Sequence, residues 1–248
     1  MIKAKYDAAQ NTIVIVGVNS GIGQALVNQL LESNATVYGV DIQAFSKAQI
    51  SDNFHYFKAN PLDKEEFTIT ASKIAQETSI VDGLVNLSGT IKNFRPIEEL
   101  DITDWNETYD ISFKSCFNSC KLFSSLLKKS SSGAIVNMVS GLAFIGQKNY
   151  GPYSAGKASV LSFSRTLAAE LAPRIRVNSV APGAVDTPFI YKEDGTTRFD
   201  VEAYKSIVPL GTMAKPEEIS SVILFLLSDG ASHLTGQCIH INGGAGMN

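Results

Sequence analysis

The chain has 248 residues, of which 44% are hydrophobic and 18% charged, and its formal net charge is −3. These values exclude a disordered protein and fit one large α/β domain or two small ones, with a substantial core. A slightly acidic chain without basic runs excludes nucleic acid and membrane surfaces as partners, and no stretch approaches the roughly 18 apolar residues of a transmembrane helix. The apolar run 13–18 is too short for a signal peptide, so we expect a cytoplasmic protein.

Strands and helices are predicted to alternate from residue 12 onward. Residues 12–16 are apolar on both faces, as in a central parallel strand, and lead through a glycine-rich turn into an amphipathic helix over 24–31. Further strands are predicted over 36–40, 55–59 and 83–86, with a helix over 64–77 between the last two.

The second half of the chain repeats this alternation. A long helix is predicted over 103–128 with Thr103 as its N-cap, then a strand over 134–139. A buried helix begins near Tyr153 and ends at Leu171, and a strand over 176–180 follows it. A helix over 216–227, with Pro216 near its first position, and a strand over 237–242 close the chain.

This order predicts a single doubly wound α/β domain of the Rossmann type over residues 1–248, with a seven-stranded parallel sheet flanked by helices. The only long irregular segment is about 184–204, and long loops in compact domains are usually functional. We therefore expect this segment to cover a substrate.

The cysteines and histidines indicate no metal chemistry. Cys116 and Cys120 share a helical face and Cys238 falls in a predicted strand, so we interpret all three as packing residues. The three histidines lack the spacing of zinc ligands or of a catalytic triad. We expect no metal and no Ser-His hydrolysis.

The turn after the first strand has the spacing G-x-x-x-G-x-G. A strand-to-helix turn with three glycines lets backbone N–H groups approach a pyrophosphate, although such turns can also merely close a loop. The residues expected to contact a dinucleotide here are Gly17, Asn19, Ser20, Gly21, Ile22 and Gly23.

Asp41 stands at the end of the second strand, eighteen residues after Gly23. A carboxylate there can accept hydrogen bonds from both ribose hydroxyls and repels a 2′-phosphate, and no Arg or Lys immediately follows it. This favours NAD over NADP, unless Asp41 is only a solvated acid at a strand end.

Tyr153 and Lys157 lie four residues apart, on one face of the predicted helix. An ammonium group favours the phenolate and lowers the tyrosine pKa, but one lysine does not supply the roughly three units needed to reach neutrality. A second positive charge, such as an oxidised nicotinamide ring, has to contribute. Taken alone, the pair can also arise by chance.

Taken together, these motifs resemble the short-chain dehydrogenase/reductase family, in its single-domain type of about this length. The resemblance covers nearly the whole chain and includes Ser140, thirteen residues before Tyr153, and the ending 234–244. The matching residues are Gly17, Gly21 and Gly23, the run 86–89 after the fourth strand, Ser140, Tyr153 and Lys157, and Pro182 and Gly183 followed by Asp186 and Thr187.

The resemblance implies a role for each catalytic residue. Tyr153 is the general acid/base, Lys157 lowers its pKa and binds the nicotinamide ribose, and Ser140 holds the substrate oxygen. Thr187 and the Val185 backbone contact the carboxamide. The further cofactor contacts that it implies are Asn60, Asn86, Gly89, Pro182 and Gly183.

The chain departs from the family pattern at several positions. Ser112 stands where the family has an Asn that holds a water linking the lysine to solvent, and we include Ser112 among the catalytic residues. Asn60 replaces a frequent Asp near adenine, and Val16, Leu87 and Ser88 are further replacements. These departures affect the details of cofactor binding and leave Ser140, Tyr153 and Lys157 unchanged.

The expected substrate is a partly apolar secondary alcohol or ketone, such as a small alcohol, a polyol or a sterol-like compound, with Phe94, Phe144 and Ile145 as added walls of its site. A 3-oxoacyl thioester reductase is an alternative, although Asp41 argues against its usual NADP. A catalytically silent NAD-binding regulator or scaffold is another. Relatives pair their two long helices, so the resemblance implies a homotetramer.

Overall fold

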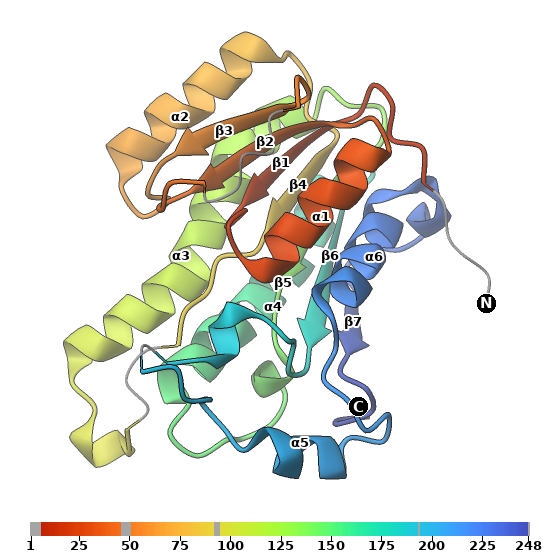
Figure 1. The fold of residues 1–248 in the computed structure, drawn as a ribbon. Helices are drawn as coiled ribbons and strands as arrows, with labels where there is room; N and C mark the ends of the chain where they lie inside the picture. The colour runs from red at the N-terminus through yellow and green to blue at the C-terminus, as the bar shows by residue number, and fades with distance from the viewer. Residues whose placement is uncertain (1–5, 46–50, 92–94, 193, 248) are drawn as a thin grey trace.

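The structure, a computed structural model, describes residues 6–45, 51–91, 95–192 and 194–247. A seven-stranded parallel sheet runs through it, in the order β3-β2-β1-β4-β5-β6-β7 (Figure 1). This sheet confirms the predicted Rossmann-type fold. The strands are β1 (Thr12–Val16), β2 (Thr36–Asp41), β3 (Phe54–Lys58), β4 (Gly83–Asn86), β5 (Gly133–Met138), β6 (Ile175–Pro182) and β7 (Cys238–Ile241).

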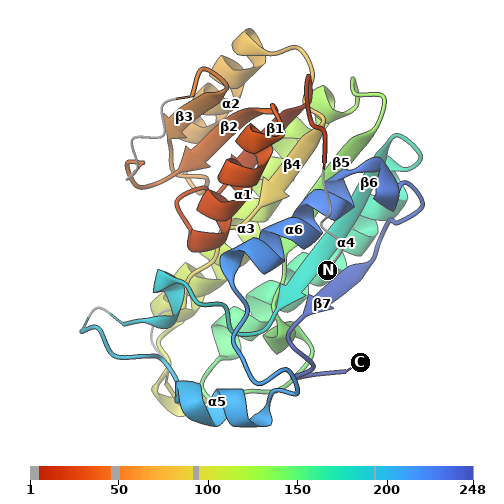
Figure 2. The ribbon, with the colours of Figure 1, turned by 45° about the vertical axis from the view of Figure 1, so that its right-hand side comes forward.

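Helices cover both faces of the sheet. The first core layer contains α1 (Gly21–Glu32) and α6 (Pro216–Leu227), and the opposite layer contains α2 (Lys64–Glu77), α3 (Ile102–Leu127) and α4 (Gly151–Leu171). The short α5 (Val201–Ile207) lies beyond the carboxyl ends of the strands (Figure 2). The 3-10 turns are η1 (Ile97–Glu99), η2 (Gly141–Ala143), η3 (Pro188–Ile190) and η4 (Asp229–Ala231).

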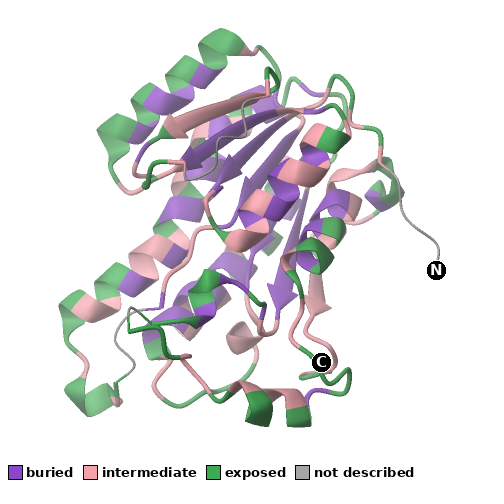
Figure 3. Ribbon diagram, in the orientation of Figure 1, coloured by how far each residue is buried: buried purple, intermediate pink, exposed green. Residues whose placement is uncertain are grey.

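Alternation along the strands divides the core into these two layers. Ile13 and Ile15 of β1 pack on the α1 and α6 side, whereas Val14 and Val16 pack on the side of α2, α3 and α4. All four side chains are buried, because a parallel sheet is covered on both faces. Figure 3 shows this pattern as a buried sheet between helices that are exposed on their outer turns.

The sheet order places the two halves of the chain side by side. β1 pairs with β2 on one side and with β4 on the other. The chain leaves β1 towards β2 and leaves β4 in the opposite direction, towards β5. A crevice forms at such a switch point, outside the carboxyl ends of the strands. The ends of β1 and β4, at Val16 and Asn86, are paired in register at this point.

Two of the sequence predictions need correction. The N-cap of α3 is Asp101, whose carboxylate accepts the Thr103 N–H at 2.7 Å. The helix begins at Ile102, so Thr103 lies inside its first turn. The segment 184–204 is also more regular than expected. It contains η3, an antiparallel bridge between Tyr191 and Thr197, and the start of α5.

Candidate active site

A cleft with a volume of about 1150 Å³ opens at the carboxyl ends of the strands. Its walls come from the turn after β1, the ends of β2 to β7, the inner sides of α3 and α4, and the segment 182–207. Most of the site residues predicted from the sequence line this one cleft. They are Gly17, Asn19, Ser20, Gly21, Ile22, Asp41, Asn60, Gly89, Ser140, Tyr153, Lys157, Pro182, Gly183, Val185 and Thr187.

Ser140, Tyr153 and Lys157 come together where β5 and α4 meet. Tyr153 and Lys157 lie on the first two turns of α4, with exposed fractions of 8% and 2%. The Lys157 Nζ donates to the carbonyls of Ser88, at 3.1 Å, and Met138, at 2.9 Å, and lies 5.8 Å from the Tyr153 ring centroid. These backbone acceptors fix the ammonium group beside the phenol.

The burial of the pair determines its proton chemistry. Burial raises the pKa of Tyr153 to about 12, and the hydrogen bond with Ser140 only partly opposes this shift. Burial also lowers the pKa of Lys157 to about 8. In the protein alone, therefore, Tyr153 is a protonated phenol at neutral pH. The lowered tyrosine pKa expected from the sequence requires positive charge beyond that of Lys157, because desolvation is the larger effect.

The glycine turn leaves room for a dinucleotide because its glycines have no side chains. A Cβ at Gly17, where φ is +88°, would lie 2.9 Å from the Ser88 N, and a Cβ at Gly21 would lie 2.7 Å from the Thr187 Cγ2. The Ser20 hydroxyl caps α1 by accepting the Gly23 N–H at 3.0 Å. The α1 N-terminus therefore faces the cleft with its backbone N–H groups accessible to an anion.

Asp41 is held in a fixed position at the end of β2. One carboxylate oxygen accepts the Asn19 N–H at 2.9 Å, and the other accepts the Gln43 N–H at 3.1 Å. The amide of Asn19 also donates to the carbonyls of Gln43 and Ala44. The carboxylate of Asp41 lines the cleft and keeps lone pairs for a further hydrogen-bond donor.

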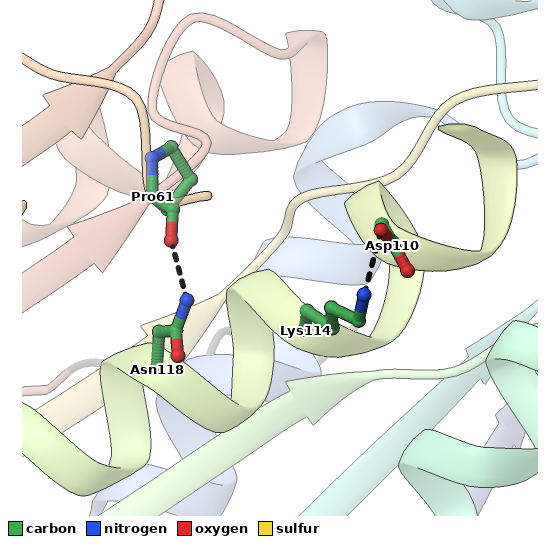
Figure 4. Close-up of polar contacts among 4 residues, drawn as sticks. All are labelled: Pro61, Asp110, Lys114 and Asn118. Carbon is green, nitrogen blue, oxygen red and sulfur yellow. Dashed lines mark hydrogen bonds and ion pairs between the residues drawn. The ribbon is translucent and has the colours of Figure 1, made fainter. Parts of the chain in front are cut away.

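The loop after β3 forms another wall of the cleft. Asn60, Pro61 and Leu62 line the cleft, and the Asn60 side-chain oxygen accepts the Leu62 N–H at 3.0 Å. Asn118 of α3 donates to the Pro61 carbonyl at 2.8 Å, while an Asp110–Lys114 ion pair lies further along the same helix (Figure 4). α3 therefore supports this wall from below.

The segment after β6 covers the opposite side of the cleft. The Tyr204 hydroxyl of α5 accepts the Ala184 N–H at 2.9 Å, and it would collide with a Cβ at Gly183, at 2.5 Å. Beyond α5, the Leu210 N–H donates to the Gly243 carbonyl at 3.1 Å. These contacts attach α5 to the turns that follow β6 and β7.

Three predicted site residues, Gly23, Asn86 and Ser112, do not line the cleft. Gly23 packs against the Val18 carbonyl, where a Cβ would lie 2.5 Å away. The Asn86 side chain is buried behind the wall and donates to Asn137 at 2.8 Å and to the Cys120 Sγ. This amide joins β4 to β5. Its predicted contact with the cofactor stays a prediction.

Ser112 lies at the contact between α3 and α4. Its Cβ lies 2.8 Å from where a Cβ of Gly156 would be, so only glycine fits opposite it. The Ser112 side chain is buried, and its hydroxyl has no hydrogen-bond partner among the described residues. Its predicted part in proton transfer stays a prediction.

Several cleft residues were not identified from the sequence as site residues. Tyr150, Arg198 and His240 line the cleft, and His240 packs against Phe144 with ring centroids 4.5 Å apart. The rule that ligands bind at the carboxyl ends of parallel strands would have indicated His240 at the end of β7. Ile145 also lines the cleft, whereas the predicted wall residue Phe94 lies outside the described residues.

The described residues contain no group of three or more His, Cys, Asp or Glu side chains placed to hold a metal ion. In the same parts of the chain, no helix has the length and apolar character needed to cross a membrane. Cys116, Cys120 and Cys238 are free thiols, and the first two are buried in the core.

Comparisons with known proteins find relatives along almost the whole chain. Residues 17–246 match a family model described as enoyl-(acyl carrier protein) reductase. The chain is 34% identical over 239 residues to the 3-oxoacyl-[acyl-carrier-protein] reductase FabG of Thermotoga maritima, covering 93% of this chain and 96% of that protein. It is 32% identical over 243 residues to the cis-4-hydroxycyclohexanecarboxylate dehydrogenase of Sinomonas cyclohexanicum, covering 95% and 96%.

A solved structure of a short-chain dehydrogenase/reductase from Brucella melitensis superimposes with a TM-score of 0.92 at 30% identity, covering 99% of this chain and all of that one. The chain therefore belongs to the short-chain dehydrogenase/reductase family, and it is an oxidoreductase enzyme.

Proposed function

We propose that this member of the family interconverts a secondary alcohol and a ketone with NAD as the hydride carrier. The observation that carries the proposal is the convergence of Ser140, Tyr153 and Lys157 in one cleft with the glycine turn. Bound nicotinamide supplies the chemistry by accepting the hydride of the alcohol or giving one to the ketone. The remaining tasks are to hold the oxygen and to move its proton.

The residues of this chain are suited to those two tasks. The Ser140 hydroxyl lies in hydrogen-bond contact with Tyr153, so an oxygen placed between them meets two hydroxyl groups. Tyr153 exchanges the proton of that oxygen. Lys157, held on the Ser88 and Met138 carbonyls, stabilises the phenolate left when Tyr153 gives its proton away.

NAD is favoured over NADP by the end of β2. The carboxylate of Asp41 is anchored by two backbone N–H groups and repels a 2′-phosphate. The hydroxyl of Ser20, in the glycine turn, is engaged as the cap of α1. Of the described residues that line the cleft, the cations are Lys157 and Arg198, and both lie on elements of the catalytic and substrate side.

A 3-oxoacyl thioester reductase is the second candidate, because the relative from Thermotoga maritima carries that activity in its name. Such an enzyme reduces a 3-oxoacyl thioester, most often with NADPH. A catalytically silent NAD-binding regulator is the third candidate, and its support is the substitution at Ser112. The catalytic trio at the cleft argues against it.

A spectrophotometric assay separates the three candidates. NADH and NADPH are oxidised against a panel of ketones and a 3-oxoacyl thioester, with wild type and Tyr153→Phe compared. We expect turnover of a ketone with NADH, reduced by about 10²- to 10⁴-fold in Tyr153→Phe, which is the usual contribution of general acid/base catalysis. NADH binding without turnover on any substrate, equal in both proteins, would favour the regulator.

A homotetramer is the expected assembly. The outer side of α3 and α4 carries an aromatic cluster in which Phe163 lies 5.7 Å from Phe113 and 5.8 Å from Phe117, between ring centroids. Phe117 is 41% exposed, and an apolar side chain of that size on a helix face favours burial against another copy. Sedimentation velocity measures the assembly, and an active monomer would contradict this part of the proposal.

A further inference from the structure

Tyr56 of β3 lies beside the segment that carries Asp41. β3 is the outermost strand on this side of the sheet and pairs with β2, so that Tyr56 lies opposite Gly39 and Lys58 opposite Asp41 (Figure 1). The Tyr56 side chain is partly buried and packs on the side of the sheet that α1 covers. It does not line the cleft itself.

The hydroxyl of Tyr56 is bound to the turn that follows Asp41. It donates to the Gln43 carbonyl and, at 3.3 Å, to the backbone carbonyl of Asp41, so that its one proton is shared between two acceptors. Burial, and after it the charge of Asp41, raises the pKa of Tyr56 to about 12. The phenol therefore keeps its proton at neutral pH and remains a donor.

The Gln43 carbonyl is held from two sides. The amide nitrogen of Asn19, in the glycine turn, donates to it at 3.0 Å, and the Tyr56 hydroxyl donates to it from β3. Because a carbonyl oxygen has two lone pairs, these two donors satisfy it completely. Gln43 is thus fixed between the glycine turn and β3.

Aromatic packing holds the far end of the same turn. The ring centroid of Phe45 lies 5.4 Å from that of Tyr56 and 4.9 Å from that of Phe54. Replacing Tyr56 by phenylalanine keeps the ring that packs on Phe45 and removes only the hydroxyl. The hydrogen bonds and the packing of Tyr56 can therefore be separated by one substitution.

The carboxylate of Asp41 depends on this turn for one of its two backbone contacts. One oxygen accepts the Asn19 N–H at 2.9 Å, and the other accepts the Gln43 N–H at 3.1 Å. The Gln43 N–H belongs to the residue whose carbonyl Tyr56 holds, so the direction of the carboxylate depends on the Tyr56 hydroxyl. Asp41 and Gln43 both line the cleft.

We propose that Tyr56 is a positioning residue for the choice of cofactor, because its hydroxyl holds Asp41 in the orientation that accepts the ribose hydroxyls of NAD and repels the 2′-phosphate of NADP. The inference rests on the proposed function, since it concerns how the same site selects NAD. Tyr56 acts through Asp41 without touching the cofactor. A carboxylate that is held before binding loses little rotational freedom when the ribose binds, whereas a carboxylate that can turn away loses both the attraction and the repulsion.

The test measures NADH and NADPH binding to a set of full-length proteins. They are wild type, Tyr56→Phe, Asp41→Ser and the double variant that combines these two substitutions. Isothermal titration calorimetry gives the Kd for each cofactor without a substrate, so the result does not depend on turnover. Tyr38→Phe is the matched control, because it removes a hydroxyl from β2 on the opposite side of the sheet, where the Tyr38 ring stacks on His55.

We expect wild type to bind NADH at least about tenfold more tightly than NADPH. Tyr56→Phe should raise the Kd for NADH by about three- to tenfold and change the Kd for NADPH less than about twofold. Tyr38→Phe should resemble wild type. When Asp41 is already serine, Tyr56→Phe should change the Kd for NADH less than about twofold, because no carboxylate is left to hold.

Three results would overturn the role of Tyr56 alone. They are a preference for NADH that Tyr56→Phe leaves unchanged, an equal loss for both cofactors, which indicates a merely structural residue, and a loss of the same size when Asp41 is already serine. Wild type without a preference for NADH would overturn both this inference and the choice of NAD in the proposed function. The proposed reaction is decided separately, by the turnover that Tyr153→Phe reduces.

Discussion

The two ends of the cleft are built by different means. At the nucleotide end, the glycine turn and Asp41 are set by backbone contacts, such as the Asn19 N–H on the Asp41 carboxylate. At the substrate end, a hairpin and the seven-residue α5 present side chains, among them Phe189 and Arg198. The first arrangement tolerates few residues at each position, whereas the second can change its side chains without changing its backbone. Members of the family can therefore share one kind of cofactor while their substrates differ.

Replacing one glycine by alanine at each end of the cleft should give the largest difference between the two ends. Gly17→Ala places a Cβ 2.9 Å from the Ser88 backbone nitrogen at a φ of +88°, whereas Gly146→Ala meets no atom within 4 Å. Backbone strain and overpacking predict a loss of about 2 to 4 kcal/mol in the free energy of unfolding for Gly17→Ala. Gly146→Ala should stay within about 0.5 kcal/mol of wild type. Urea denaturation measures both, and equal losses would contradict the contrast.

Lys157 is buried in the cleft wall, and its burial predicts that the stability of the protein depends on pH. Its folded pKa of about 8 lies below the ordinary 10.5, so between these values the unfolded chain holds a proton that the folded protein lacks. Stability conferred by this group therefore rises with pH above about 8, by about 3 kcal/mol over the full shift. Above pH 10, Tyr153 opposes the rise, because its raised pKa of about 12 favours the unfolded phenolate.

The unfolding free energy of wild type relative to Lys157→Met should therefore increase between pH 8 and pH 10. Denaturant titrations at each pH provide the measurement, and the difference isolates Lys157 from groups common to both proteins. A difference that stays flat across this range would mean that Lys157 keeps its ordinary pKa in the fold.

Asp41→Ser is a milder change, confined to the nucleotide end. Loss of charge-assisted hydrogen bonds to the ribose should lower the ratio of kcat/KM for NAD to that for NADP by about tenfold. The KM for the alcohol should not change, because Asp41 lies at the opposite end of the cleft from Arg198. A parallel rise in the alcohol KM would show that the two ends are coupled.

The smallest effect is expected for Ser112→Asn. The added amide extends from a buried position whose hydroxyl has no partner among the described residues, so it restores hydrogen-bonding capacity without displacing an existing bond. Turnover should remain within about threefold of wild type or rise, since a water relay contributes less than the proton donor itself. Complete loss of activity would mean that Ser112 packs differently against Gly156.

The sequence was sufficient where local pattern and backbone geometry agree. The bounds of β1, α2, β4 and α6 were predicted as they occur, because turn residues and apolar periodicity coincide at their ends. The N-cap of α3 was misplaced because Asp101 and Thr103 are both good caps and only the fold selects between them.

Side-chain direction is what the sequence leaves open. The amide of Asn86 donates to Asn137 of the neighbouring strand, a contact between residues 51 positions apart that no local pattern indicates. Arg198 was not identified as a cleft residue from the sequence, since the bridge between Tyr191 and Thr197 that precedes it has no strong sequence signal. The burial that raises the pKa of Tyr153 in the protein alone also depends on the packed structure, and no local pattern indicates its extent.

The attachment of α5 has a consequence for engineering. The helix is joined to the end of β6 through the Tyr204 hydroxyl on the Ala184 N–H, and neither residue belongs to the catalytic trio. Replacing Tyr204 and changing the lengths of the loops on either side of α5 would shift α5 as a unit. Ser140, Tyr153 and Lys157, which lie on other elements, would stay in place. Exchanging the segment that contains α5 is therefore a way to fit larger or smaller substrates without altering the catalytic residues.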